Sequence, residues 1–232
     1  MRPLRDLPLL IFNKTLIAAD LHLGIEYEFL SKGINLYSMN LRLKEEIEKV
    51  IEEEDVSRII FLGDLKHNVP RPVGFEAREL SEFLDFGVDV VVVKGNHDGG
   101  IELFCDDVVS ELVIEDVLLT HGHRKIELLK YKHIVVGHSH PAIEFRDELS
   151  KITREKCWFK CKLKNSNTQV TVMPAFNPLI LGTPFNRAGR IPGYLFKRER
   201  LDLEKGEVHL LDGTFLSSLK GLIRSESVDR IF

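Results

Sequence analysis

The chain has 232 residues, which is the size of one α/β domain or of a domain with a small appendage. Hydrophobic residues make up 44% and charged residues 29% of it, so collagen-like, coiled-coil and disordered classes are excluded. With 36 acidic and 32 basic residues the net charge is −4, so any attraction to nucleic acid or to an anionic membrane must be local.

The first half of the chain alternates short apolar runs with amphipathic segments. Residues 9–12 and 15–19 predict a β-hairpin, and Asn40 is expected to cap an amphipathic helix. Further strands are expected at residues 58–62, 89–94, 117–120 and 133–136, and a second helix at 75–86. This order of strand, loop and helix predicts an α/β fold in which helices cover a sheet.

The second half of the chain has strands without helices between them. They are expected at residues 158–163, 169–173, 194–203 and 207–211, joined by short turns. This pattern predicts antiparallel pairs in a second sheet. We see no internal repeat and no flexible linker. We therefore expect residues 1–232 to form a single domain, with a basic β-hairpin-like segment at about 151–173.

The cysteines and the apolar runs bear on the compartment of the protein. The nearest two cysteines, Cys157 and Cys161, fall on one predicted strand. At about 3.3 Å per residue they would lie roughly 13 Å apart, too far for a disulfide. We expect reduced thiols and a cytoplasmic protein. No apolar run is long enough to span a bilayer, so no membrane segment is expected.

Side chains of the kind that bind metals follow five of the predicted strands. Loops at the carboxyl ends of strands in α/β sheets can bring distant residues together around a ligand. Aspartate, asparagine and histidine suit Mn, Fe or Zn, and the absence of cysteine from the set excludes a structural zinc site. Seven or more ligands predict two metals rather than one. The motifs are Asp20-Leu21-His22, Gly63-Asp64, Gly95-Asn96-His97-Asp98, His121-Gly122-His123 and Gly137-His138-Ser139-His140.

A histidine at the end of one strand is more often a surface or core residue than a metal ligand. The ordered series of motifs outweighs that alternative. The series resembles the motifs of the calcineurin-like metallophosphoesterases. Residues 63–67 and 174–179 resemble in particular the small SbcD-related phosphoesterases of archaea, kin of the ligase-associated bacterial phosphoesterases. The resemblance implies a four-layer α/β/β/α sandwich with two mixed β-sheets flanked by helices, which agrees with the two sheets predicted above.

The resemblance also implies two divalent metal ions, with manganese favoured over iron, zinc, cobalt or nickel. Asp64 would bridge the two ions. His97 would be the catalytic histidine that faces the scissile phosphate, and Asp98 would orient it. The other implied ligands are Asp20, His22 and His140 for the first ion, and Asn96, His121 and His138 for the second.

The chemistry expected of such a site follows from the charges. Two cations lower the pKa of a water between them and neutralise phosphate oxygens. The bridging hydroxide can attack phosphorus in line with the leaving oxygen, so no covalent intermediate is expected. A protonated His97 would donate to that oxygen, a contribution that is typically roughly 10²–10⁴-fold.

Five further residues have weaker claims to a role in substrate binding. The two histidines among them adjoin predicted ligands, and each has a solvated or outward-pointing alternative. The three arginines are candidate phosphate contacts, although a plain surface loop is the simpler interpretation for the first of them. These residues are His67, His123, Arg71, Arg187 and Arg190.

Residues 151–164 carry six basic side chains and one acidic one, and Trp158 and Phe159 interrupt them. One interpretation is a surface for a phosphate backbone, with an aromatic side chain for base stacking. The other is an edge strand whose lysines prevent aggregation. The sequence slightly favours the second interpretation, and the resemblance to nuclease-related proteins makes the two even.

We expect a dinuclear-metal-dependent phosphoesterase that hydrolyses phosphodiesters of DNA or nucleotides. A phosphomonoesterase or nucleotide hydrolase would use the same ligands, so the ligands do not discriminate. A catalytically inactive scaffold is the third alternative, but such a protein would be expected to lose His97 or a ligand, and all are present. The resemblance allows a homodimer and a helicase, ligase or ATPase partner, yet no heptad or apolar stripe specifies one.

Overall fold

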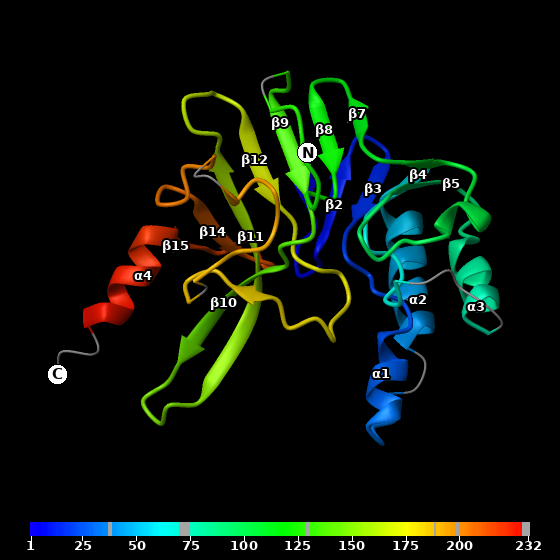
Figure 1. The fold of residues 1–232 in the computed structure, drawn as a ribbon, viewed down its shortest axis with the longest axis horizontal. Helices are drawn as coiled ribbons and strands as arrows, with labels where there is room; N and C mark the ends of the chain where they lie inside the picture. The colour runs from blue at the N-terminus through cyan, green and yellow to red at the C-terminus, as the bar shows by residue number, and fades with distance from the viewer. Residues whose placement is uncertain (37–38, 70–74, 129, 188, 198–199, 229–232) are drawn as a thin grey trace.

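The computed structural model describes residues 1–36, 39–69, 75–128, 130–187, 189–197 and 200–228. Two β-sheets pack against each other, and the helices α1, α2 and α3 gather on the side of the first sheet (Figure 1). The β-hairpin of β10 and β11 projects from the second sheet (Figure 1). No helix in the described part of the chain is long and apolar enough to cross a membrane.

The first sheet has six strands in the order β1-β2-β3-β4-β5-β6. It is parallel from β3 to β6 and antiparallel from β1 to β3. Its strands are β1 (Arg2–Pro3), β2 (Leu9–Phe12), β3 (Thr15–Ala18), β4 (Arg58–Leu62), β5 (Asp89–Val93) and β6 (Val108–Val109). The helices between them are α1 (Ile25–Ser31), α2 (Met39–Glu53), α3 (Phe75–Leu84) and a 3₁₀ turn at Ile101–Leu103.

The second sheet has nine strands and is also mixed. Its main order is β13-β10-β11-β12-β9-β8-β7, and β14 pairs with both β11 and β15. Its strands are β7 (Leu112–Ile114), β8 (Val117–Thr120), β9 (His133–Val136), β10 (Pro141–Arg146), β11 (Ile152–Lys162), β12 (Gln169–Val172), β13 (Thr183–Pro184), β14 (Glu207–Leu210) and β15 (Phe215–Ser218). The helix α4 (Leu219–Val228) follows β15.

Alternating side chains along the strands divide between separate apolar cores. In β4, Phe61 packs in the core that includes side chains of α2 and α3, whereas Ile60 packs in the core between the sheets. In β9, Val135 joins the core between the sheets and Val136 faces a third core. Loop residues and Leu219 of α4 cover that third core. The predicted α/β fold with two mixed sheets is confirmed, and its fourth layer is built from loops as much as from a helix.

The strand predicted at residues 194–203 is wrong. The described residues there form a loop, of which only Leu201 makes an isolated bridge, to Leu163. The Tyr194 amide instead donates to the carbonyl of Gly122, and the guanidinium of Arg200 lies 4.0 Å from the Tyr194 ring centroid. The alternation in the sequence reflects a loop with one buried side, which the periodicity alone cannot separate from a strand.

Candidate metal centre

The predicted ligands lie just beyond the carboxyl ends of neighbouring strands. Asp20 follows β3 and Asp64 follows β4, and these two strands are parallel neighbours. His121 and His138 follow β8 and β9, which are parallel neighbours in the other sheet. The amide of His138 donates to Oδ2 of Asp20 at 2.9 Å, although the two residues are 118 positions apart. The polar residues at the strand ends of the two sheets therefore lie close together.

Three groups of side chains bring their ligand atoms within 4.8 Å of one another, close enough to hold an ion. The first two groups together contain six of the seven residues expected as ligands. The third contains the expected catalytic histidine. The groups are Asp20, His22 and His140; Asp64, His121 and His138; and His22, His67 and His97.

Imidazole nitrogens in the site approach carboxylate oxygens without always forming hydrogen bonds. Nε2 of His121 lies 3.0 Å from Oδ1 of Asp20 and 3.5 Å from Oδ2 of Asp64, so this ring joins the first two groups. Nε2 of His140 lies 3.1 Å from Oδ1 of Asp20. Nε2 of His22 and of His140 are buried and have no hydrogen-bond partner among the described residues. Buried polar atoms need partners, and a cation between these ligands would supply one. The residues present therefore fit divalent metals.

The ionisation of several groups suits metal binding, which requires neutral imidazoles and charged carboxylates. Burial lowers the pKa of His22 to about 3 and that of His138 to about 4. Burial would raise the pKa of Asp20, but the nearby His140 and His121 outweigh it and leave this pKa below its usual range. Both rings would therefore offer free lone pairs at neutral pH, and Asp20 would be charged.

The pKa values of Asp64 and His121, at the centre of the site, shift in the opposite direction. Burial raises the pKa of Asp64, and the neighbouring Asp20 and Asp98 add to that effect. Burial would lower the pKa of His121, but the adjacent carboxylates of Asp20 and Asp64 outweigh it and raise this pKa above its ordinary value. In the protein without ions, the carboxylates therefore favour the protonated form of His121. A divalent cation would replace that positive charge and favour the ionised form of Asp64.

Five of the predicted ligands have a left-handed backbone, which is uncommon for residues other than glycine. This conformation costs on the order of 1–2 kcal/mol per residue, and such strain is concentrated at functional sites. The turns aim the side chains across the ends of the strands. The residues and their φ angles are Asp20 (57°), His22 (47°), Asp64 (48°), His138 (64°) and His140 (43°).

Glycines before the ligands allow the strand ends to approach closely. A Cβ at Gly95 would lie 2.2 Å from both the backbone nitrogen and Oδ1 of Asp64. A Cβ at Gly63 would lie 2.4 Å from the ring of His121. Since real Cβ contacts are never this short, any other residue would push the ligand groups apart.

His97 is held against Asp64 by its backbone and against the neighbouring loop by its ring. Its amide donates to Oδ1 of Asp64 at 2.8 Å, and its Nδ1 lies 2.5 Å from the carbonyl oxygen of His67. The resemblance implies that Asp98 orients this ring, and the structure shows which groups the Asp98 carboxylate contacts. The buried carboxylate of Asp98 accepts from the amides of Gly95, at 2.7 Å, and Lys66, at 3.3 Å. Asp98 therefore fixes the loop that carries His97.

Of the two further candidate histidines, His67 belongs to the third ligand group, and His123 lies beside the second. Nε2 of His67 lies 3.2 Å from Oε2 of Glu28 on α1. Nδ1 of His123 lies 3.0 Å from Nδ1 of His121, and burial lowers the pKa of His123 to about 4. A neutral His123 can orient the ring of His121 through this contact.

The remaining candidates are one asparagine and three arginines. Asn96, expected as a metal ligand, is exposed. Nε of Arg187 lies 3.7 Å from Oε1 of Glu144 on β10, and Arg190 is exposed. Arg71 lies outside the described residues.

Lys156 is a residue that the sequence analysis left without a role in the site. Its Nζ donates to the carbonyls of Ala175 and Asn177, at 2.6 Å each. Asn177 in turn donates from Nδ2 to the carbonyl of Leu21 at 2.7 Å, between two predicted ligands. Burial lowers the pKa of Lys156 to about 8. No signal in the sequence indicates this role, because Lys156 precedes the strand predicted at residues 158–163.

We expect Lys156→Met to destabilise the fold by about 1.5–3 kcal/mol, because two carbonyls lose a charged donor. Metal affinity should also fall by roughly 10–100-fold, as for other residues that support ligands. Urea unfolding in chelator and metal titration measure the two effects. The matched control is Lys162→Met, since Lys162 is exposed on the same strand. Equal stability and metal affinity in both variants would contradict the role of Lys156.

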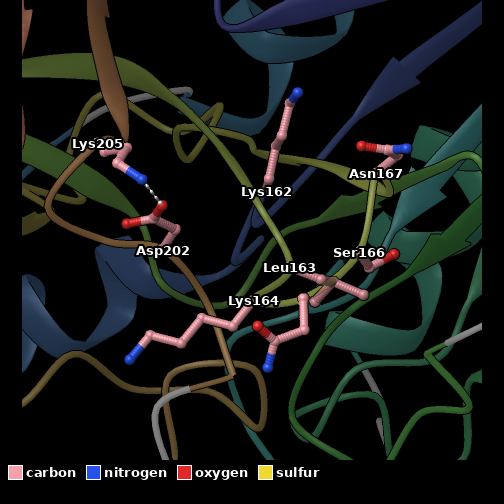
Figure 2. A pocket seen from close by; sticks show the side chains of 8 residues that line it. Lys162, Leu163, Lys164, Ser166, Asn167, Asp202 and Lys205 are labelled. Carbon is pink, nitrogen blue, oxygen red and sulfur yellow. Dashed lines mark ion pairs between the residues drawn. The ribbon is translucent and has the colours of Figure 1, made fainter.

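The basic side chains of residues 151–164 do not converge on one site. Lys162 and Lys164 line an open depression of about 600 Å³, and Figure 2 shows their side chains pointing away from each other. Lys205 in the same depression pairs with Asp202 at 3.0 Å. The edge-strand interpretation is wrong for the middle of β11, since Phe159 and Lys160 pair with both β12 and β14.

His133 provides a pH dependence that is independent of the ligand groups. Its Nε2 lies 2.8 Å from Oγ1 of Thr171, and burial lowers its pKa from 6.5 to about 4, with smaller effects of the N-terminal amine and Lys160. Between these two values the unfolded chain binds a proton that the folded chain does not, so stability falls as the pH falls from 6.5 to 4. His133→Gln should lose less stability than the unsubstituted chain between about pH 7 and about pH 5. Urea unfolding in chelator tests this, and an equal loss would contradict it.

Comparisons with known proteins show the family of the chain and a solved structure with its fold. A model of the calcineurin-like phosphoesterase family matches residues 14–211. The solved structure of Pseudomonas putida nuclease MPE has the same fold, with 21% identity, a TM-score of 0.57, and coverage of 86% of this chain and 85% of that one. The phosphoesterase Yfce of E. coli is 16% identical over 88% of this chain and 96% of that one, with a TM-score of 0.41. The comparison with curated proteins found no significant match. The chain belongs to the calcineurin-like phosphoesterase family, whose members are metal-dependent hydrolases.

Proposed function

We propose that the protein hydrolyses phosphodiesters of DNA or nucleotides with the help of two divalent metal ions. The observation that carries this proposal is the convergence of two ligand groups, linked through His121 and Asp64, beside His97. Manganese is the first metal to test, because mixed carboxylate and imidazole ligands suit it.

Asp20, His22 and His140 would hold one ion, and Asp64, His121 and His138 the other. Asp64 would bridge the two ions, and Asn96 would join the second set. When bound, the two ions would neutralise phosphate oxygens and supply an activated water for in-line attack. The residues of the chain would hold the ions and the phosphate in position and exclude other groups from the site.

His97 is suited to protonate the leaving oxygen. Its Nδ1 is 2.5 Å from the carbonyl of His67, so this nitrogen carries a proton and Nε2 is left to meet the substrate. A proton on Nε2 would pass to the leaving alkoxide as the bond to phosphorus breaks. The short link to the backbone also keeps the ring from turning away from the phosphate.

DNA is the first natural substrate to test, because the fold is shared with a Pseudomonas putida protein named as a nuclease. Rates on a bis(aryl) phosphate and on an aryl phosphate, each with Mn, Fe, Zn, Co and Ni, separate a diesterase from a monoesterase. We expect the diester to be the better substrate. Single- and double-stranded oligonucleotides follow, and DNA affinity should fall steeply with salt.

Three outcomes would count against the proposal. Preference for the monoester would favour a phosphomonoesterase or nucleotide hydrolase. A flat response to salt would remove DNA as the substrate. Failure to hydrolyse either ester with any of the five metals would leave an inactive scaffold of the same fold.

A further inference from the structure

A cavity of about 260 Å³ lies where the N-terminal segment meets β11 and β14. None of the candidate metal ligands in the described chain lines it. Its walls combine apolar residues with basic ones. The residues that matter here are Pro3, Leu4, Arg5, Trp158, Lys160 and His209.

The strand register explains why the basic side chains meet in this cavity. Trp158 and Lys160 are two residues apart on β11 and therefore share one face of the sheet. His209 of β14 pairs directly with Trp158 and lies on the same face. This face packs in the core between the sheets, to which Trp158 belongs. The opposing strand β1 has only two residues, so the core ends here and leaves the cavity open beside Lys160.

Two donors that line the cavity lack acceptors. Trp158 is only 1% exposed, and its Nε1 has no hydrogen-bond partner among the described residues. A buried donor without an acceptor is costly, and such groups are rare in folded proteins. No described acceptor pairs with Nζ of Lys160 either. Two residues that line the cavity thus carry donors without acceptors, the N–H group of Trp158 and the ammonium group of Lys160.

The charges that line the cavity favour an anion. Arg5 adds a second cation, which is only loosely paired with Asp6, at 3.8 Å. Asp212 is a carboxylate in the lining, and its oxygens accept from the amide and the hydroxyl of Thr214, at 2.8 and 3.0 Å. The lining therefore carries two positive charges, on Lys160 and Arg5, and one negative charge, on Asp212. The carboxylate of Asp212 is already hydrogen-bonded to Thr214.

We propose that this cavity binds a small oxyanion, a phosphate or a carboxylate group. An oxygen of the anion accepts from Nε1 of Trp158, and Lys160 and Arg5 neutralise its charge. The apolar side chains of Pro3 and Leu4 exclude water from one side of it. The cavity is smaller than most sites for drug-sized ligands, so the occupant is a small molecule or the end of a larger one. This site is separate from the candidate metal centre, and its existence does not depend on the proposed function.

The chain contains one tryptophan, so its indole reports on this cavity alone. We expect the single indole ¹H–¹⁵N signal of the zinc-loaded protein to shift saturably during titration with inorganic phosphate, acetate or AMP. Phosphate and AMP acting without acetate would identify a phosphate site, and acetate acting alone a carboxylate site. The same titrations by calorimetry extend to Trp158→Phe, which replaces the indole and its N–H with a smaller apolar ring and should bind the anion more weakly.

Lys160→Met should weaken the binding by about tenfold or more, the loss expected for one charge-assisted hydrogen bond. Lys162→Met is the matched control, because Lys162 lies on the same strand and lines the other depression. It should leave the affinity unchanged. No saturable shift with any of the three probes would overturn the proposal. Equal weakening by the two lysine variants would also overturn it, because it would indicate general charge attraction instead of a site.

Discussion

Asp64→Asn should lower phosphodiester turnover more than roughly 10–100-fold. That range is the usual cost of losing a residue that only supports a metal ligand. Oδ2 of Asp64 lies 3.8 Å from Nε2 of His22 and 3.5 Å from Nε2 of His121, within reach of both ligand groups. Asparagine keeps the volume and the acceptor for the His97 amide but removes the negative charge. Bound metal per chain should therefore fall, as measured by elemental analysis after gel filtration.

Stability in chelator distinguishes a loss of activity caused by misfolding from a loss caused by missing metal ions. The Asp64 carboxyl is buried close to Asp20, and burial raises its pKa, so removing its charge should leave stability in chelator equal or higher. Asp89→Asn is the matched control, because this carboxylate is exposed at the start of β5. Asp64→Asn with two bound ions and normal turnover would contradict the role of Asp64 as a bridge.

His97→Asn should retain both metals and lose roughly 10²–10⁴-fold in kcat on a diester with an alkyl leaving group. The metals should remain because His97 contacts Asp64 through its backbone amide, which the substitution leaves in place. Diesters with an aryl leaving group should suffer much less, since a stable aryloxide needs no proton. Rates across leaving groups of rising pKa measure this difference directly.

The slope of rate against leaving-group pKa is the sensitive readout for His97. It should become steeper in the variant, because the chain no longer donates a proton to poor leaving groups. His133→Asn serves as a control histidine substitution away from the ligand groups and should leave the slope unchanged. An equal loss on alkyl and aryl diesters would show that His97 acts only in binding, and no loss at saturating metal would remove it from the reaction.

Where apolar runs fill both faces of a strand, the sequence predicts the structure closely. The strands predicted at residues 58–62, 117–120 and 133–136 coincide with β4, β8 and β9. These strands are short, wholly apolar over most of their length, and followed at once by polar residues. The same contrast predicts where the metal-type side chains gather, because the carboxyl ends of neighbouring parallel strands lie at one edge of a sheet.

Residues whose setting depends on distant partners were not predictable. Strand β10 was missed because Glu144 and Arg146 interrupt its apolar pattern, although Arg154 pairs with Glu144 at 3.0 Å. The helix α2 begins at Met39, before the expected cap, and the amide of Gly24 donates to Oδ1 of Asn40 at 3.4 Å. In each case a polar side chain contacts a partner ten or more residues away in the sequence, and the local pattern does not encode that contact.

The unusual φ angles of the five ligand residues also imply how this chain would change if it lost its activity. Glycine adopts that conformation without penalty, so replacements by glycine at these positions would relieve the backbone strain while removing the candidate ligand groups. A chain that no longer needs to hydrolyse a substrate would tolerate such replacements, and its fold would be more stable in the absence of metal. Aspartate and histidine at all five positions therefore lower the stability of the backbone in exchange for side chains that could bind metal.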